Sequence, residues 1–146
     1  MKNLKVDRMG RFAVELEVSN YKDLVKVEEG SLEATDVRRK IIRGVVDPGA
    51  TLLVLPLALA NELGLPIMKQ RIKLRYADGR RSIRQEAHAV YVRLEGREGI
   101  FTAIVEPKRD TVLIGAIVLE QFDLLVDCRK GRVLPRDPDF VLAEIE

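Results

Sequence analysis

The stretch IIRGVVDPGATLLVLP, residues 41–56, carries one carboxylate, Asp47, between two apolar runs. A charge in an apolar setting costs desolvation free energy unless it has a partner or a use. Pro48 and Gly49 follow directly, so the chain is expected to turn at this point. Two interpretations stay open. Either the Asp47 carboxylate satisfies backbone donors of a tight turn, or it is half of an active site that a second copy of the chain completes.

The segments around Asp47 have the patterns of β-strands. Residues 11–20 alternate apolar and polar side chains, which predicts a half-buried strand. The apolar runs at 41–46 and 50–56 predict two buried strands, one on each side of the Asp47 turn. Residues 21–40 are more polar and are expected to form a loop or an extension.

Two short helices are expected among the strands. Pro56 stands where a helix can begin, Gly64 is a candidate for the residue after its last turn, and Pro66 prevents continuation. A second helix is expected around 116–122, after an apolar strand that ends at Gly115. The predicted fold class is therefore all-β, with mostly strands and two short helices.

Turn signals predict two hairpins. Ala77, Asp78 and Gly79 separate two strand-like segments, and residues 129–131 separate two more near the C-terminal end. The strand before Ala77 has basic residues on one parity and apolar residues on the other, which predicts a basic face. The basic residues are Lys69, Arg71, Lys73 and Arg75. Asp78 and Asp127 are expected to accept backbone N–H groups within their turns.

Length and composition indicate one soluble domain. The 146 residues are 47% hydrophobic and 33% charged, which is enough apolar content for a core. The domain is assigned to residues 1–146, with its core at about 10–135 and a C-terminal tail at 136–146. No apolar stretch approaches the roughly 20 residues that span a bilayer, and no secretory signal pattern is present. Cys128 alone cannot form an internal disulfide, so a cytoplasmic location without membrane contact is expected.

Residue counts disfavour several kinds of chemistry. His88 is the one histidine and Cys128 the one cysteine, so a chain cannot build a zinc site from such ligands. A Ser-His-Asp triad would have to use His88, whose alternating context favours an ordinary half-buried strand position. The net charge of +2 gives little steering toward nucleic acid. No metal or cofactor is expected.

The order of these features, from about Gly10 to Pro135, resembles the retropepsin-like aspartic proteases. The turn of that family usually reads Asp-Thr-Gly or Asp-Ser-Gly followed by Ala. The matching residues are Asp47, Pro48, Gly49 and Ala50. The segments Val54-Leu55-Pro56 and Glu62-Leu63-Gly64-Leu65 also resemble the family.

Two further elements are identified through the resemblance. The apolar-apolar-Gly element that packs beside the active-site loop would be Leu113, Ile114 and Gly115. The flap that closes over substrate would be the hairpin around Ala77, Asp78 and Gly79.

The resemblance implies a closed barrel, one domain per chain, that hydrolyses peptide bonds as a homodimer. Two carboxylates held close together share one proton, so that one is a base and the other an acid toward water and the scissile carbonyl. Because the chain has a single Asp-x-Gly-Ala turn, a two-fold dimer would supply the second Asp47 carboxylate. The implied partners are a second copy of the chain and an extended protein or peptide substrate.

Pro48 departs from the family pattern. In the family, the Thr or Ser hydroxyl at this position braces the two loops across the dimer axis, whereas proline has neither a hydroxyl nor an amide hydrogen. Gly49 is expected to adopt dihedral angles that only glycine visits cheaply. Three outcomes stay open: an active aspartic peptidase, a slow one, or a catalytically inactive dimer that acts as a peptide-binding or assembly module.

A nucleic-acid-binding β-barrel is the rival interpretation. Basic side chains between residues 69 and 84 could contact phosphates. They are Lys69, Arg71, Lys73, Arg75, Arg80, Arg81 and Arg84. Tyr76 is the one aromatic residue among them, so stacking platforms for bases are missing. A solvated strand face, or recognition of acidic peptide segments, accounts for the same residues.

Overall fold

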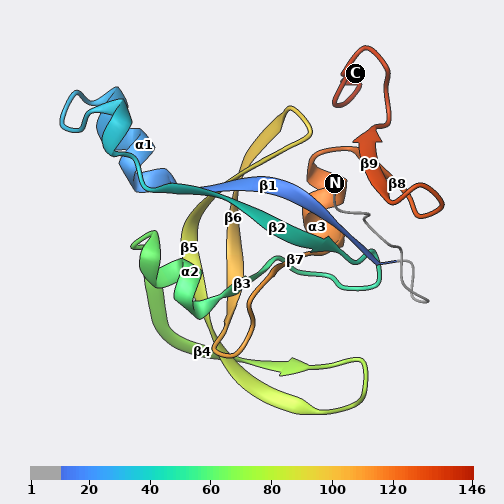
Figure 1. Cartoon of the computed structure of the whole chain (residues 1–146), viewed down its shortest axis with the longest axis horizontal. Helices are drawn as coiled ribbons and strands as arrows, with labels where there is room; N and C mark the ends of the chain where they lie inside the picture. Colours follow the sequence, from blue (N-terminus) through green and yellow to red (C-terminus); the bar gives the residue numbers. More distant parts are fainter. Residues whose placement is uncertain (1–10) are drawn as a thin grey trace.

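Six strands close into a barrel in the computed structural model, which describes residues 11–146 (Figure 1). In spatial order they are β1 (Phe12–Asn20), β2 (Arg39–Val46), β7 (Val112–Ile114), β3 (Val54–Pro56), β6 (Arg97–Glu106) and β5 (Arg81–Leu94). The barrel closes because β5 also pairs antiparallel with β1, from Glu17 opposite Arg93 to Asn20 opposite Val90. A seventh strand, β4 (Ile67–Arg75), pairs with β5 outside the ring. The prediction of a mostly β closed barrel is confirmed.

Alternating side chains of the strands fill the barrel. Val18, Val46 and Ile114 are fully buried inside it, as the alternation and the apolar runs require. The helix after β7 adds Phe122, whose ring meets Phe101 edge to face with 5.3 Å between centroids. These contacts extend the core from the barrel interior to the helix after β7.

Residues 11–146 form three short α-helices where the sequence predicted two. The predicted helices are α2 (Leu57–Glu62) and α3 (Ala116–Gln121), each near its expected position. The third, α1 (Tyr21–Glu28), and a single 3-10 turn, η1 (Ala34–Asp36), lie within residues 21–40, where the prediction of a loop or extension missed the helix. Helix α1 begins at a local cap, since the Asn20 side chain accepts a hydrogen bond from the Asp23 amide at 3.1 Å.

A buried carboxylate ties α1 to the barrel. Asp23 is only 3% exposed and forms a two-pronged pair with the Arg38 guanidinium, at 2.9 Å for each contact. The hydrogen bonds from the Arg38 side chain lower the Asp23 pKa from 3.8 to about 2. The side-chain Nδ2 of Asn20 also donates to the carbonyls of Leu63 and Gly64, so α1 and the end of α2 are joined.

The predicted strand at 50–56 is shorter in the structure. Only Val54–Pro56 forms a strand, because the carbonyls of Ala50 and Thr51 accept hydrogen bonds from the start of α3 instead of from a neighbouring strand. The last predicted hairpin is present as β8 (Leu124–Asp127) and β9 (Arg132–Pro135). Figure 1 shows this hairpin at the opposite end of the molecule from α1.

Strand β5 contains a bulge that reverses its inward-facing parity. Ala87 lies opposite Ala103, but Val90 lies opposite Phe101, so β5 has one extra residue here. Ala89 within the bulge adopts a positive φ of 57°. On the far side of the bulge the even-numbered residues Val90 and Val92 face the core, and before it the odd-numbered Ala87 does.

None of the helices within residues 11–146 is long and apolar enough to cross a membrane.

Candidate active site

The Asp47 loop leaves the end of β2 and is held by its own backbone. The Asp47 amide donates to the Ile114 carbonyl at 3.0 Å, and the Ala50 amide donates to the Asp47 carbonyl at 3.0 Å. One carboxylate oxygen, Oδ1, accepts from the Gly49 amide at 3.1 Å. Within residues 11–146 the other oxygen, Oδ2, has no hydrogen-bond partner. The half-buried Asp47 therefore fills a turn role with one oxygen and leaves the other available.

The Leu113-Ile114-Gly115 element lies against this loop. Strand β7 lies between β2 and β3, with Val46 opposite Ile114 and Val54 opposite Leu113. At the end of β7, a Cβ atom on Gly115 would lie 2.3 Å from the Leu52 carbonyl oxygen. Only glycine fits this position without displacing the loop. The structure thus places these three residues beside the Asp47 loop, and their part in an active site stays a prediction.

The start of α3 holds the loop from a second direction. The Ala116 amide donates to the Ala50 carbonyl at 2.8 Å, and the Ile117 amide donates to the Thr51 carbonyl at 3.0 Å. These backbone bonds replace strand pairing at residues 50 and 51. The loop is thus fixed within a single chain.

Gly49 serves a different purpose from the predicted one. The expectation of dihedral angles reserved for glycine is wrong, since its φ does not lie in the left-handed region. A Cβ atom at this position would lie 3.3 Å from Asp47 Oδ1, which is a tight contact. Gly49 therefore allows its amide to approach the carboxylate. Pro48 and Gly49 are exposed, and Ala50 is half-buried.

The hairpin predicted as a flap is present as β4 and β5, with a tight tip. Ala77, Asp78 and Gly79 are all exposed there, and Gly79 has a φ of 86°. Asp78 accepts from the Arg80 amide at 3.0 Å and pairs with its guanidinium at 2.7 Å. The Arg80 amide, followed by its side chain, lowers the Asp78 pKa. The turn role predicted for Asp78 is confirmed, and no hydrogen bond of the described residues joins this tip to the Asp47 loop.

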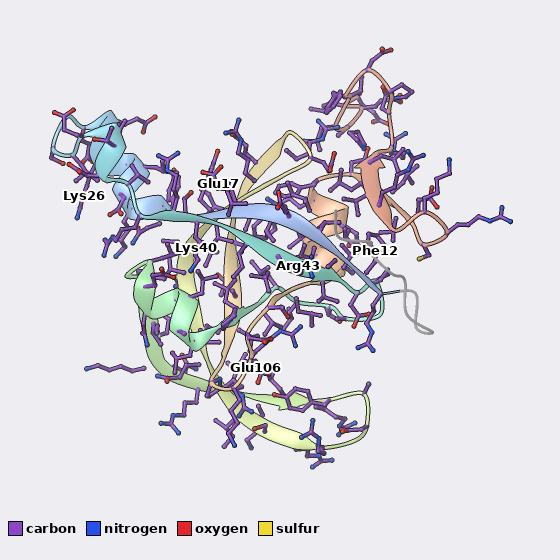
Figure 2. The ribbon with its side chains drawn as sticks, viewed as in Figure 1. Phe12, Glu17, Lys26, Lys40, Arg43 and Glu106 are labelled. Atoms are coloured by element: carbon purple, nitrogen blue, oxygen red, sulfur yellow. The ribbon has the colours of Figure 1, made fainter. Side chains whose placement is uncertain are left out.

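This hairpin is anchored by a polar cluster, which the sequence did not suggest. Tyr76 donates from its hydroxyl to Glu106 at 2.6 Å, and Arg84 pairs with the other oxygen of Glu106 at 3.2 Å. Burial, and then the hydrogen bond to Glu106, raise the Tyr76 pKa. Figure 2 shows Glu106 at the end of β6, where the hairpin leaves the barrel. No pattern in the sequence pairs residues so far apart.

The remaining polar candidates lie outside this site. Asp127 accepts from the Lys130 amide at 3.1 Å in the β8–β9 turn, and that bond lowers the Asp127 pKa. His88 is half-buried in β5, where its amide donates to the Pro66 carbonyl. The turn role of Asp127 and the strand position of His88 are confirmed. Cys128 is exposed in the β8–β9 turn.

The family of the chain follows from a sequence comparison. The family model described as "gag-polyprotein putative aspartyl protease" matches residues 24–121, which include the Asp47 loop, the hairpin and Gly115. The chain belongs to this family. A search of curated protein sequences found no match.

Three solved structures are similar to this chain to different extents. A retropepsin-like aspartic protease from Rickettsia conorii is 20% identical with a TM-score of 0.52, covering 85% of this chain and 82% of that one. The retroviral protease-like domain of Ddi1 from Leishmania major is 17% identical with a TM-score of 0.46, covering 66% and 75%. The EIAV protease complexed with the inhibitor HBY-793 is 20% identical with a TM-score of 0.43, covering 55% and 75%. The first of these likenesses supports the retropepsin-like fold of this family member.

Proposed function

We propose that the chain is an aspartic endopeptidase that works as a homodimer with one Asp47 from each subunit. The observation that carries this proposal is the seating of the Asp47 loop by Ile114, Ala116 and Ile117. This backbone framework holds the carboxylate at the end of β2 with one oxygen unpaired within the described residues. A turn that served only to reverse the chain would not need such a framework.

The proposed reaction needs two carboxyl groups. Two facing carboxylates hold one proton between them, because both cannot ionise cheaply at close range. The ionised group takes a proton from a water molecule as the oxygen of that water attacks the peptide carbonyl. The protonated group donates to the carbonyl oxygen. Proton transfer to the leaving nitrogen then completes cleavage, and no metal or covalent intermediate takes part.

A two-fold dimer provides the second carboxyl group. An isologous interface brings the same residue of both subunits to the symmetry axis. Retropepsin-like proteins typically act as such dimers on peptide substrates, and this chain has one Asp-x-Gly-Ala turn. The β4–β5 hairpin of each subunit would close over the bound peptide as a flap.

Pro48 is compatible with this proposal because the loop is braced within one subunit. The hydrogen bonds from Ala116 and Ile117 fix the backbone of Ala50 and Thr51 without any side chain at position 48. Proline also restricts the residue before it to extended dihedral angles, which limits the motion of Asp47. We infer that these two restraints take the place of the hydroxyl brace of the family.

The experiment that tests the proposal is cleavage of a mixed peptide library from acidic to neutral pH. Wild type is compared with Asp47→Asn, Pro48→Thr and the control Asp36→Asn, which makes the same change on the exposed turn η1. All four are run at the same fraction of dimer. We expect wild type and Asp36→Asn to cut and Asp47→Asn to be silent.

Three other outcomes would contradict the proposal of a peptidase that uses Asp47. If wild type is silent while Pro48→Thr cuts, the natural protein is a peptide-binding or assembly module of the same fold. If every variant dimerises and none cuts, the protein is not a peptidase. Equal cleavage by wild type and Asp47→Asn would move the chemistry to another site.

A further inference from the structure

The β4–β5 hairpin carries a basic surface on the side that continues the barrel interior. We call it the basic hairpin face. It consists of Arg71, Lys73, Arg75, Arg81 and Ile83, all of them exposed. Figure 2 shows side chains with terminal nitrogens projecting from this hairpin.

Strand register places this face on the core side of the sheet. Ala87 lies opposite Ala103 and Gln85 lies opposite Val105, and the two alanines and Val105 belong to the core. Because side chains alternate along a strand, Ile83 shares the side of Ala87 and Gln85.

The pairing of β4 with β5 places residues of β4 on the same side of the sheet. Lys73 lies opposite Ile83, and Arg75 lies opposite Arg81. Beyond the barrel no strand covers this side of the hairpin within residues 11–146. The interior side of the barrel sheet is thus continuous with the basic hairpin face, which is exposed to solvent.

Two hollows lie along this path. The first has a volume of about 180 Å³ and joins Leu57 of α2 and Val105 of β6 to Arg71 and Ile83 of the hairpin. The second has a volume of about 680 Å³ and is lined near the tip by Lys73, Arg75, Arg81 and Ile83, with Leu74 and Ser82. Together they give room for an extended chain.

The charge along the path has one sign. The two acidic residues of the segment 67–94 are Asp78 and Glu86. Asp78 is paired with Arg80 at the tip, at 2.7 Å, and Glu86 lies opposite Ile104, on the outer side of the sheet. Neither side chain neutralises the basic hairpin face.

We propose that the basic hairpin face binds acidic side chains of an extended peptide and selects substrates with Asp or Glu beside an apolar residue. The inference rests on the proposed peptidase function and names the substrate class of that site. Lys73, Arg75 and Arg81 would pair with the carboxylates, and Ile83, which is 54% exposed, would contact the apolar residue.

The absence of aromatic residues on this face favours peptide over nucleic acid. Single-stranded nucleic acids are held by aromatic side chains on which bases stack. Tyr76, the aromatic residue of the hairpin, is bonded to Glu106 on the outer side, and Arg80 lies over its ring at 5.1 Å. The face therefore offers charge and an aliphatic contact without a stacking platform.

The test separates binding from cleavage. Two fluorescent peptides with the same apolar residues carry either Glu or Gln at the flanking positions. Their affinities are measured by anisotropy with Asp47→Asn protein, and their cleavage is measured with wild type. We expect the Glu peptide to bind about tenfold more tightly at low salt, as several exposed ion pairs allow. The difference should shrink as added salt screens the charges.

Variants locate the effect on the hairpin. Changing Lys73, Arg75 and Arg81 together to Glu should invert the preference, and changing them together to Gln should remove it. A matched control changes Lys22, Lys26 and Lys130, which are exposed away from the hairpin, to Glu. The control should keep the preference for the Glu peptide. Sedimentation of each variant reports whether the dimer is intact.

Each contrary result has a distinct meaning. Equal affinity for the Glu and Gln peptides overturns the inference, even if wild type cleaves both. A preference that survives the hairpin variants places recognition elsewhere. Tighter binding of a single-stranded oligonucleotide than of the Glu peptide assigns the face to nucleic acid, and loss of the dimer in both hairpin variants assigns it to a second copy. If the Glu peptide binds selectively but is never cut, the peptidase proposal fails and the binding inference stands.

Discussion

Gly115 lies so close to Leu52 that a methyl group at position 115 would stand 2.3 Å from the Leu52 carbonyl oxygen. The φ of Gly115 is −91°, an ordinary value for any residue, so the need for glycine here is entirely one of space. This contact joins the end of β7 to the loop that carries Asp47. The Asp47 loop and the strand beside it must therefore move together.

Substitution of Gly115 by Ala should displace the loop and abolish cleavage. Overpacking of this kind costs about 2 kcal/mol of unfolding free energy. The control is Gly30→Ala, where φ is 80° and no atom lies within 4 Å of the added methyl group. The control should lose stability through backbone strain yet keep its activity per folded molecule. Denaturant melts and peptide cleavage measure the two effects, and an active Gly115→Ala protein would contradict the seating of the loop.

Substitution of Asp23 by Asn should lower stability in a pH-dependent way. The Asp23 pKa is about 2 in the folded chain against 3.8 ordinarily, so folding favours the ionised form. That contribution, about 2 kcal/mol, is fully present above about pH 4 and is lost as pH falls toward 2. Unfolding free energies of wild type and Asp23→Asn should therefore differ at pH 7 and converge in acid. A constant difference across this range would contradict the Asp23–Arg38 pairing.

Substitution of Glu106 by Gln should loosen the β4–β5 hairpin. The change removes the charge that Arg84 pairs with and weakens the hydrogen bond from Tyr76. Amide hydrogen exchange in β4 should then be faster by about tenfold. If the hairpin closes over substrate, KM should rise more than kcat falls.

Glu98→Gln is a matched control for the hairpin experiment. Glu98 is bonded to Tyr91 at 2.7 Å and to Arg93 at 2.8 Å, the same three residue types at the other end of β5 and β6. This variant should leave hairpin exchange and KM unchanged. Equal effects of the two variants would show that the hairpin has no specific anchor at Glu106.

Mixing wild type with Asp47→Asn should lower activity under the proposed mechanism, because a mixed dimer would have one Asp47 carboxyl group where the proposed reaction needs two. At equal amounts and full dimerisation, random pairing leaves about half of the wild-type activity, and larger excesses lower it further in proportion. The measurement is cleavage at fixed wild-type concentration as the variant is titrated in and subunits exchange. Unchanged activity would mean that one chain contains a complete site.

The sequence was most informative where local patterns decide the structure. The Asp47 turn, the helix between Pro56 and Gly64 and the hairpin tip at Gly79 follow from short-range signals of turns and caps. Helix α1 was missed because its start depends on the cap at Asn20 and on Arg38, fifteen residues beyond Asp23. The shortened third strand was missed for a similar reason, since α3 takes the hydrogen bonds of residues 50 and 51.

Some residues of the candidate site were predicted from the sequence and others were not. Asp47 was singled out by its apolar setting and Gly115 through the resemblance, and the structure brings their segments together. The cluster of Tyr76, Arg84 and Glu106 was not found, because thirty residues separate Tyr76 from Glu106 and neither stands in a motif. The sequence also could not predict which side chains of the hairpin lie on the core side of the sheet. That orientation depends on the bulge in β5, a strand whose alternation otherwise continues.

The number of residues in that bulge decides which side chains of the hairpin face the barrel side. Val90 faces inward after it and Ala87 before it, so the extra residue near Ala89 turns Ile83 and the basic residues toward the barrel side. Removal of one residue here would present Ser82 and Arg84 of β5, with Ile72 and Leu74 of β4, in their place. Deletion of a single codon could thus replace the basic hairpin face by a less charged surface without a substitution at any residue of that face.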